Sequence, residues 1–161
     1  MTTTQMEVAI AKWWDPRKHL IVPNISWGLL SYEADMLIVR PTGYCIEVEI
    51  KRSYKDYKDD FKKRKWKVRP NNGQGNLIKE FYYAFPIELW EKRMDDIVEL
   101  LPDFAGVLTC HKDRGMLYTQ LQRSATPNRM ARPLRNDEMF QLARLGTLRI
   151  WSLKRTILKL L

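Results

Sequence analysis

The sequence predicts a single α/β domain, with a mixed central sheet flanked by helices and an additional C-terminal helix. The chain has 161 residues, which is the usual length of one domain. Hydrophobic residues make up 45% of the chain, enough to form a substantial core. Segments with the apolar pattern of strands alternate with segments of helical periodicity, as they do in α/β proteins.

The first third of the chain predicts one helix and three strands. Apolar residues at helical spacing over 6–14 predict the helix. Apolar or alternating runs predict strands at 20–22, 34–40 and 44–51. Pro41-Thr42-Gly43 is a turn signal between the last two, so these strands should form a hairpin.

The rest of the chain alternates between helices and strands. Ser53 is the expected N-cap of a helix that reaches about Trp66, and residues 69–75 form the clearest loop. Further strands are expected at 80–85, 105–110 and 116–121, with helices at 87–101 and from Asn136 onward. We therefore divide the chain into a domain at 1–135 and a helical extension at 136–161, packed on the same domain or on a partner.

Composition and charge narrow the classes of function. The formal net charge is +9 and the sequence pI is about 9.6, a balance that points to a polyanionic partner such as nucleic acid. Cys45 and Cys110 form neither a disulfide framework nor a paired metal-binding motif. The N-terminus lacks the regions of a signal peptide, and no apolar stretch is long enough to span a membrane. We therefore expect a cytoplasmic protein that does not bind membranes.

Charged residues occupy one face of the strand predicted at 44–51. Because side chains alternate along a strand, Tyr44, Ile46, Val48 and Ile50 should point into the core. Glu47, Glu49 and Lys51 then point the other way. Burying charged groups costs several kcal/mol unless they are paired or bind a metal ion. This face of the strand is therefore a candidate site.

The preceding strand begins with a second acidic pair, Glu33 and Asp35. The hairpin turn brings the start of this strand near the end of the next one, which places Asp35 close to Glu49 and Lys51. The cluster is rich in carboxylate oxygens and has no histidine or cysteine nearby. Such ligands suit Mg²⁺ or Mn²⁺ and do not suit zinc.

Asp35, followed by Glu49-Ile50-Lys51 on the next strand, resembles the D…(D/E)xK signature of the PD-(D/E)xK nuclease superfamily. The predicted order of helix, three strands, helix and strand is that of its common core, so the resemblance implies a restriction-endonuclease-like core. The stretch from the signature through Asp59-Asp60-Phe61 to residues 81–86 is similar to small MmcB-type DNA-repair nucleases of that superfamily. The resemblance covers roughly residues 6–110, and Ala34 stands where many members have proline.

The resemblance also implies a mechanism. Asp35 and Glu49 would hold one or two Mg²⁺ ions together with the backbone carbonyl of Ile50. Lys51 would orient the attacking water or stabilise charge on the phosphate. Other acids that could join the metal site are Glu33, Glu47 and Glu7. The implied activity is hydrolysis of phosphodiester bonds, in DNA rather than RNA, during repair, recombination or the processing of phage or mobile-element DNA.

A strongly basic segment follows the candidate site. Residues 51–69 hold 10 basic and 3 acidic side chains. Helical spacing places four lysines near one face beside the proposed metal site: Lys55, Lys58, Lys62 and Lys65. We expect them to contact the phosphate backbone of nucleic acid. A solvated helix face is the alternative interpretation.

Other interpretations of the chain remain open. Glu47, Glu49 and Lys51 could form the solvated face of an edge strand. The same fold could also bind nucleic acid or another protein without cleaving it. A basic interaction module acting through residues 136–161 is a third interpretation, and this helix could pack on its own domain or form a homodimer.

Overall fold

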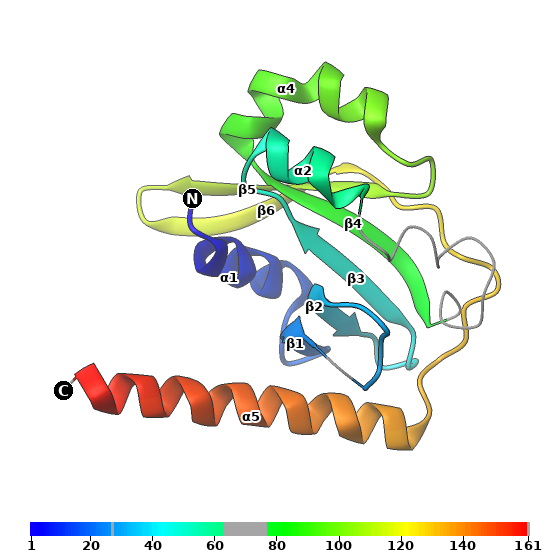
Figure 1. The fold of residues 1–161 in the computed structure, drawn as a ribbon, viewed down its shortest axis with the longest axis vertical. Coiled ribbons are helices and arrows are strands. Elements are labelled where there is room, and N and C mark those ends of the chain that lie inside the picture. Colours follow the sequence, from blue (N-terminus) through cyan, green and yellow to red (C-terminus); the bar gives the residue numbers. More distant parts are fainter. Residues whose placement is uncertain (27, 63–76, 161) are drawn as a thin grey trace.

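A mixed sheet of six strands forms the centre of the computed structural model (Figure 1), which describes residues 1–26, 28–62 and 77–160. The strands are β1 (Leu20–Ile25), β2 (Ala34–Val39), β3 (Cys45–Ile50), β4 (Ile78–Pro86), β5 (Gly106–Asp113) and β6 (Met116–Arg123). The helices in the described ranges are α1 (Thr3–Trp14), α2 (Tyr54–Asp60), α4 (Ile87–Leu100) and α5 (Asn136–Leu160). The prediction of one α/β domain with a mixed sheet is confirmed.

The strands lie in the sheet in the order of the sequence. Strands β1, β2 and β3 are antiparallel, β3, β4 and β5 are parallel, and β5 and β6 are antiparallel. The predicted turn joins β2 to β3, where Gly43 has a φ of 83° and donates its N–H to the carbonyl oxygen of Arg40. A positive φ favours glycine, which explains the turn signal. The three parallel strands end at the same edge of the sheet.

Helices cover both faces of the sheet (Figure 1). Helix α1 packs on one face through Met6, Ala9 and Ile10, which have helical spacing. The side chains of β3 that face α1 are Ile46, Val48 and Ile50, as predicted. The other face packs against α2, α4 and the first half of α5. Because all six residues of β3 are buried in the middle of the sheet, the interpretation of a solvated edge strand is wrong.

Helix α2 is shorter than predicted. Ser53 is its N-cap, as expected, and its hydroxyl accepts a hydrogen bond from the Asp56 N–H at 3.1 Å. The helix ends at Asp60 rather than near Trp66. The backbone N–H groups of Phe61 and Lys62 donate hydrogen bonds to the carbonyl oxygens of Lys58 and Asp59, three residues earlier. This i→i−3 pattern replaces the α-helical one and ends the helix. The loop expected at 69–75 lies outside the described residues.

Helix α1 and strands β1, β4, β5 and β6 extend beyond the segments predicted from apolar patterns, whereas β2, β3 and α4 end within one residue of the predicted bounds. Helix α1 begins at Thr3 because Thr2 and Gln5 form a capping box. Strand β4 begins at Ile78, two residues earlier than expected, and β6 continues to Arg123. Periodicity marks the buried part of an element, whereas polar caps and strand ends follow from backbone hydrogen bonds.

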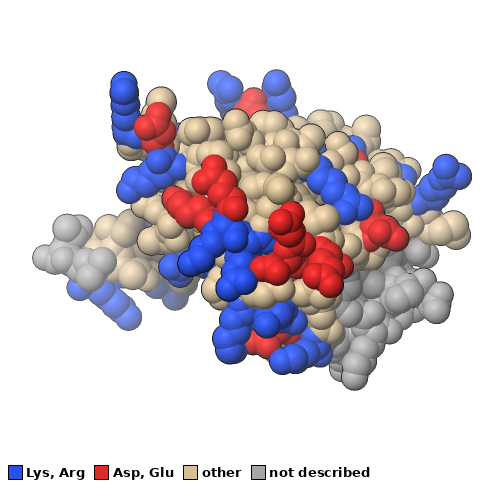
Figure 2. Space-filling view, turned by 90° about the horizontal axis from the view of Figure 1, so that it is seen from above, with Lys and Arg blue, Asp and Glu red and all other residues tan. Residues whose placement is uncertain are grey.

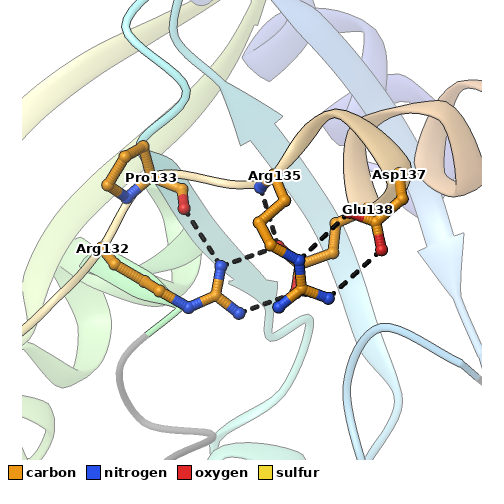
Figure 3. A network of polar contacts seen from close by, with 5 residues as sticks. All are labelled: Arg132, Pro133, Arg135, Asp137 and Glu138. Atoms are coloured by element: carbon orange, nitrogen blue, oxygen red, sulfur yellow. Dashed lines mark hydrogen bonds and ion pairs between the residues drawn. The ribbon is translucent and has the colours of Figure 1, made fainter.

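The start of α5 is held by ion pairs and hydrogen bonds with the segment just before it (Figure 3). The Glu138 carboxylate accepts two hydrogen bonds from the Arg132 guanidinium, both at 2.7 Å, and one from the Arg135 backbone N–H at 2.8 Å. Leu142 is buried, and Gly146 lies against Val22 of β1. The first half of this helix therefore packs on its own domain.

The second half of α5 extends past the sheet (Figure 1). All side chains from Ile150 to Lys159 are exposed. Large apolar side chains exposed on α5 are Phe140, Leu148, Ile150, Trp151, Leu153, Ile157 and Leu158. In the described part of the chain, no helix is apolar over a length that could cross a membrane.

Candidate active site

Strands β2 and β3 bring Asp35 and Glu49 together at one edge of the sheet. Met36 pairs with Val48 in the antiparallel register, so Asp35 and Glu49 lie opposite each other one residue further along. The Asp35 Oδ2 atom accepts a hydrogen bond from the backbone N–H of Ile50 at 2.8 Å. Asp35 is partly exposed, whereas Glu49 is buried. The hairpin thus places two carboxylates side by side, with Asp35 toward solvent.

The environment of Asp35 disfavours its negative charge. Burial and the neighbouring Glu49 carboxylate raise the pKa of Asp35 to about 6, and the Ile50 N–H and the Lys51 ammonium oppose this only in part. Desolvation and like charges both favour the protonated form of a carboxyl group. A bound cation would reverse this balance, because it would attract both carboxylates.

Lys51 lies directly behind the carboxylate pair, in a buried network. Its Nζ is 3.2 Å from Glu49 Oε2 and 2.8 Å from Oδ1 of Asp60, the last residue of α2. The other Asp60 oxygen, Oδ2, accepts a hydrogen bond from the Tyr83 hydroxyl of β4 at 2.8 Å. These four residues come from β3, the chain just after it, α2 and β4. The network therefore joins three elements at the ends of the parallel strands.

The charges of this network support one another. Burial lowers the pKa of Lys51, but the Glu49 and Asp60 carboxylates outweigh burial, so its pKa lies above the usual value. Burial and the adjacent Asp60 carboxylate raise the pKa of Tyr83. Lys51 thus keeps its proton, and Tyr83 stays a neutral hydrogen-bond donor.

The two carboxylates suit Mg²⁺ or Mn²⁺, which keep water or phosphate ligands. They do not form a site closed by protein ligands alone. Within residues 1–26, 28–62 and 77–160, no group of three or more histidine, cysteine or acidic side chains is arranged to hold a metal ion. Mg²⁺ commonly binds through one or two carboxylates and keeps water or substrate phosphates as its other ligands. Asp35 and Glu49 supply two adjacent carboxylates, which meets that requirement.

The other predicted acids have separate surroundings. Glu47 is fully buried and accepts a hydrogen bond from the Tyr32 hydroxyl at 2.6 Å. Glu7 of α1 accepts one from the Asn24 side-chain amide at 3.3 Å. Glu33 is exposed. The described contacts join none of these three acids to the pair formed by Asp35 and Glu49.

The lysines expected to contact nucleic acid lie on the surface of α2 and beyond it. Lys55 and Lys62 both form ion pairs with Asp59, at 2.7 and 2.8 Å, and these bonds lower the pKa of Asp59 to about 2. Lys58 lies over the ring of Tyr54. Lys65 is outside the described residues. Acidic and basic side chains are intermixed on the face that includes α2 and α4 (Figure 2), so this face is not uniformly positive.

Asp60 and Tyr83 were not among the predicted site residues. Asp60 shares the buried side of α2 with Tyr57, because it lies three residues after Tyr57. An acid on the buried face of a helix is a signal that it has a buried partner. Tyr83 lies in a continuous apolar strand, and nothing in that pattern distinguishes it from its neighbours.

Comparisons with known proteins add a likeness of fold. No family model matches the chain, and the comparison with curated proteins gives no match. A solved structure of similar fold is the SPO1766 protein of unknown function from Silicibacter pomeroyi, with 16% sequence identity and a TM-score of 0.62. The match covers 98% of this chain and 91% of that chain, so it includes most of α5. At this identity the likeness shows the fold alone.

Proposed function

We propose that the protein is a metal-dependent nuclease that hydrolyses phosphodiester bonds in DNA. The observation that carries the proposal is the pair formed by Asp35 and Glu49, held together at a solvent-accessible edge, with the pKa of Asp35 raised to about 6 and Lys51 beside Glu49. The order of α1, β1 to β3, α2 and β4 is also the order expected of a restriction-endonuclease-like core, which supports the proposal.

The residues of the site have distinct roles in this proposal. A divalent cation would supply Lewis-acid activation of the phosphate and a water of lowered pKa. Asp35 and Glu49 bind the cation, and the Ile50 N–H fixes the orientation of the Asp35 carboxylate. The Lys51 ammonium donates a hydrogen bond to Glu49 and stabilises negative charge that develops on the phosphate.

A non-cleaving binding module is the second candidate function. The observation that favours it is the burial of Lys51, which is 1% exposed and bound to Glu49 and Asp60. In that case the network stabilises the junction between β3 and α2, and basic surface residues bind nucleic acid without chemistry. Lys55 and Lys62 contribute less to such binding because Asp59 neutralises part of their charge.

The deciding experiment is a cleavage assay with plasmid, linear and branched DNA and with RNA, in the presence of Mg²⁺ or Mn²⁺. We expect metal-dependent cleavage of DNA by the unaltered protein. Replacing a metal ligand or the lysine, as in Glu49→Gln and Lys51→Ala, should lower the rate by roughly 10²-fold or more.

Glu80 provides a matched control. It is a buried carboxylate of β4 with a cationic partner, Arg40, at 2.9 Å. Glu80→Gln therefore removes a comparable charge from a different place, and its cleavage rate should stay near that of the unaltered protein. If the protein binds DNA without cutting it, and binding is the same in Glu49→Gln and Lys51→Ala, the non-cleaving module is the correct function.

A further inference from the structure

The Lys51 network contains one more carboxylate than a structural ion pair needs. Glu49 alone would neutralise the ammonium, which lies 3.2 Å away. Asp60 nevertheless lies closer, at 2.8 Å, and is fully buried. The ammonium therefore contacts two carboxylates, while a third, that of Asp35, is held by the N–H of the neighbouring residue Ile50. Excess buried negative charge is destabilising unless a cation offsets it.

A cation at Asp35 and Glu49 would change the balance of these contacts. It would draw the negative charge of Glu49 toward itself and weaken the attraction between Glu49 and Lys51. Asp60 would keep its contact with Lys51, because it belongs to α2 and not to the hairpin that carries Asp35 and Glu49. Lysine has a flexible four-carbon side chain, so a fixed anion is needed to keep its Nζ in one place.

Tyr83 fixes the orientation of Asp60. Its hydroxyl donates to Asp60 Oδ2 at 2.8 Å, which leaves Oδ1 facing the ammonium. The Tyr83 ring is itself fully buried and packs edge-on against Tyr57, with ring centroids 5.0 Å apart. A buried hydrogen bond to a charged group has a defined geometry and is stronger than one between neutral groups.

We propose that Asp60 is the positioning residue for Lys51, and that Tyr83 holds Asp60 in the required orientation. The inference rests on the proposed function, since it assigns Asp60 a role through the lysine of that site. Asp60 itself faces Lys51 and Tyr83 and touches no substrate. Its effect is expected on the rate of the chemical step rather than on binding of DNA.

The test compares Asp60→Asn and Tyr83→Phe with Tyr57→Phe as the matched control. The Tyr57 hydroxyl is also buried, but it donates to the Ile97 carbonyl oxygen at 3.1 Å and has no part in holding Lys51. We expect Asp60→Asn to lower kcat by roughly 10²-fold with little change in KM, as a misplaced catalytic group does. Tyr83→Phe should lower kcat less, and Tyr57→Phe should leave it unchanged.

A second readout does not depend on cleavage. Reductive methylation followed by mass spectrometry measures how readily the Lys51 amine reacts, compared with the exposed Lys55 in the same sample. Lys51 should be protected in the unaltered protein and in Tyr57→Phe, and should be labelled faster in Asp60→Asn and Tyr83→Phe.

Each outcome separates the two proposals. Unchanged labelling of Lys51 in Asp60→Asn, or wild-type kcat in that variant, overturns the positioning role even if the protein is a nuclease. Equal losses of kcat in Tyr83→Phe and Tyr57→Phe would show a general packing effect and overturn it as well. If the unaltered protein does not cleave, the nuclease proposal and the catalytic meaning of Asp60 both fail, and labelling still decides whether Asp60 holds Lys51.

Discussion

Two networks of charged side chains lie at opposite ends of β3. At its C-terminal end, Asp35 and Glu49 lie together with Lys51 and Asp60. At its N-terminal end, the Glu138 carboxylate of α5 lies close enough to Cys45 to raise the pKa of its thiol, although burial is the larger cause. Both networks lie near the same strand, but their electrostatics are opposite.

The difference lies in the pKa values of the acids. The pKa of Glu138 is lowered, mainly by its hydrogen bonds with Arg132, so folding favours its charged form. The pKa of Asp35 is raised to about 6 by burial and by Glu49, so folding disfavours its charged form. In a network that stabilises the fold, side chains of opposite charge are paired. A network that keeps like charges together loses stability, and such unfavourable arrangements are typical of functional sites.

The largest expected effect is stabilisation by a divalent cation. At a Mn²⁺ concentration about 100 times its Kd, the free energy of unfolding should rise by about 2.7 kcal/mol. Thermal unfolding with and without Mn²⁺ measures this rise. The Glu49→Gln variant should lose most of it, whereas Glu138→Gln should keep it. An equal rise in all three proteins would place the bound cation away from Asp35 and Glu49.

A smaller effect is expected at the other end of β3. Glu138→Gln removes the charge that binds Arg132 and weakens the contact with the Arg135 N–H, so the free energy of unfolding should fall by about 1–2 kcal/mol. Because the folded-state pKa of Glu138 is lowered, the loss should be full near neutral pH and should shrink as the pH falls through the acidic range. Denaturant unfolding at pH 7 and at low pH measures both values. A loss that does not depend on pH would contradict the ionic role.

The smallest effect, and one of opposite sign, is expected for Asp35→Asn. The folded-state pKa of Asp35 is about 6 and its ordinary value is 3.8, so its contribution to stability is present below about pH 4 and is lost as the pH rises through 6. Asparagine has no such loss, so the variant should gain stability relative to the unaltered protein as the pH rises from 4 to 7. Metal-free protein and urea unfolding at pH 4 and pH 7 provide the measurement. A variant that is less stable at pH 7 than at pH 4, relative to the unaltered protein, would refute the raised pKa.

The position of Asp35 beside Glu49 could be predicted because it depends on local rules. The two-residue period of a strand places Glu49 and Lys51 on one face, and the turn containing Gly43 sets the hairpin. The same rules could not show which of Glu47 and Glu49 belongs to the candidate site, because both lie on the same face of the strand. Tyr32 reaches Glu47 from the segment between β1 and β2, which has no periodic pattern to indicate its path.

The places of Asp60 and Tyr83 in the Lys51 network could not be predicted, because they depend on longer-range geometry. Asp60 reaches Lys51 because α2 ends where it does, and the sequence pattern predicted a longer helix. Tyr83 lies beside Glu49 through the parallel register of β3 and β4. Residues 51–77 separate these strands, and no turn motif fixes such a register.

The attachment of α5 has a mechanical consequence. Arg149, which donates hydrogen bonds to the Asn24 carbonyl oxygen and the Ser26 hydroxyl, comes just before the run of exposed side chains. From there to Leu160 the helix rises by about 16 Å. The helix is therefore held at its N-terminal end by the contacts of Glu138, and its last described contact with the domain is that of Arg149. A small tilt of the helix at Arg149 would displace each later residue in proportion to its distance from Arg149, so the C-terminal end would be displaced most.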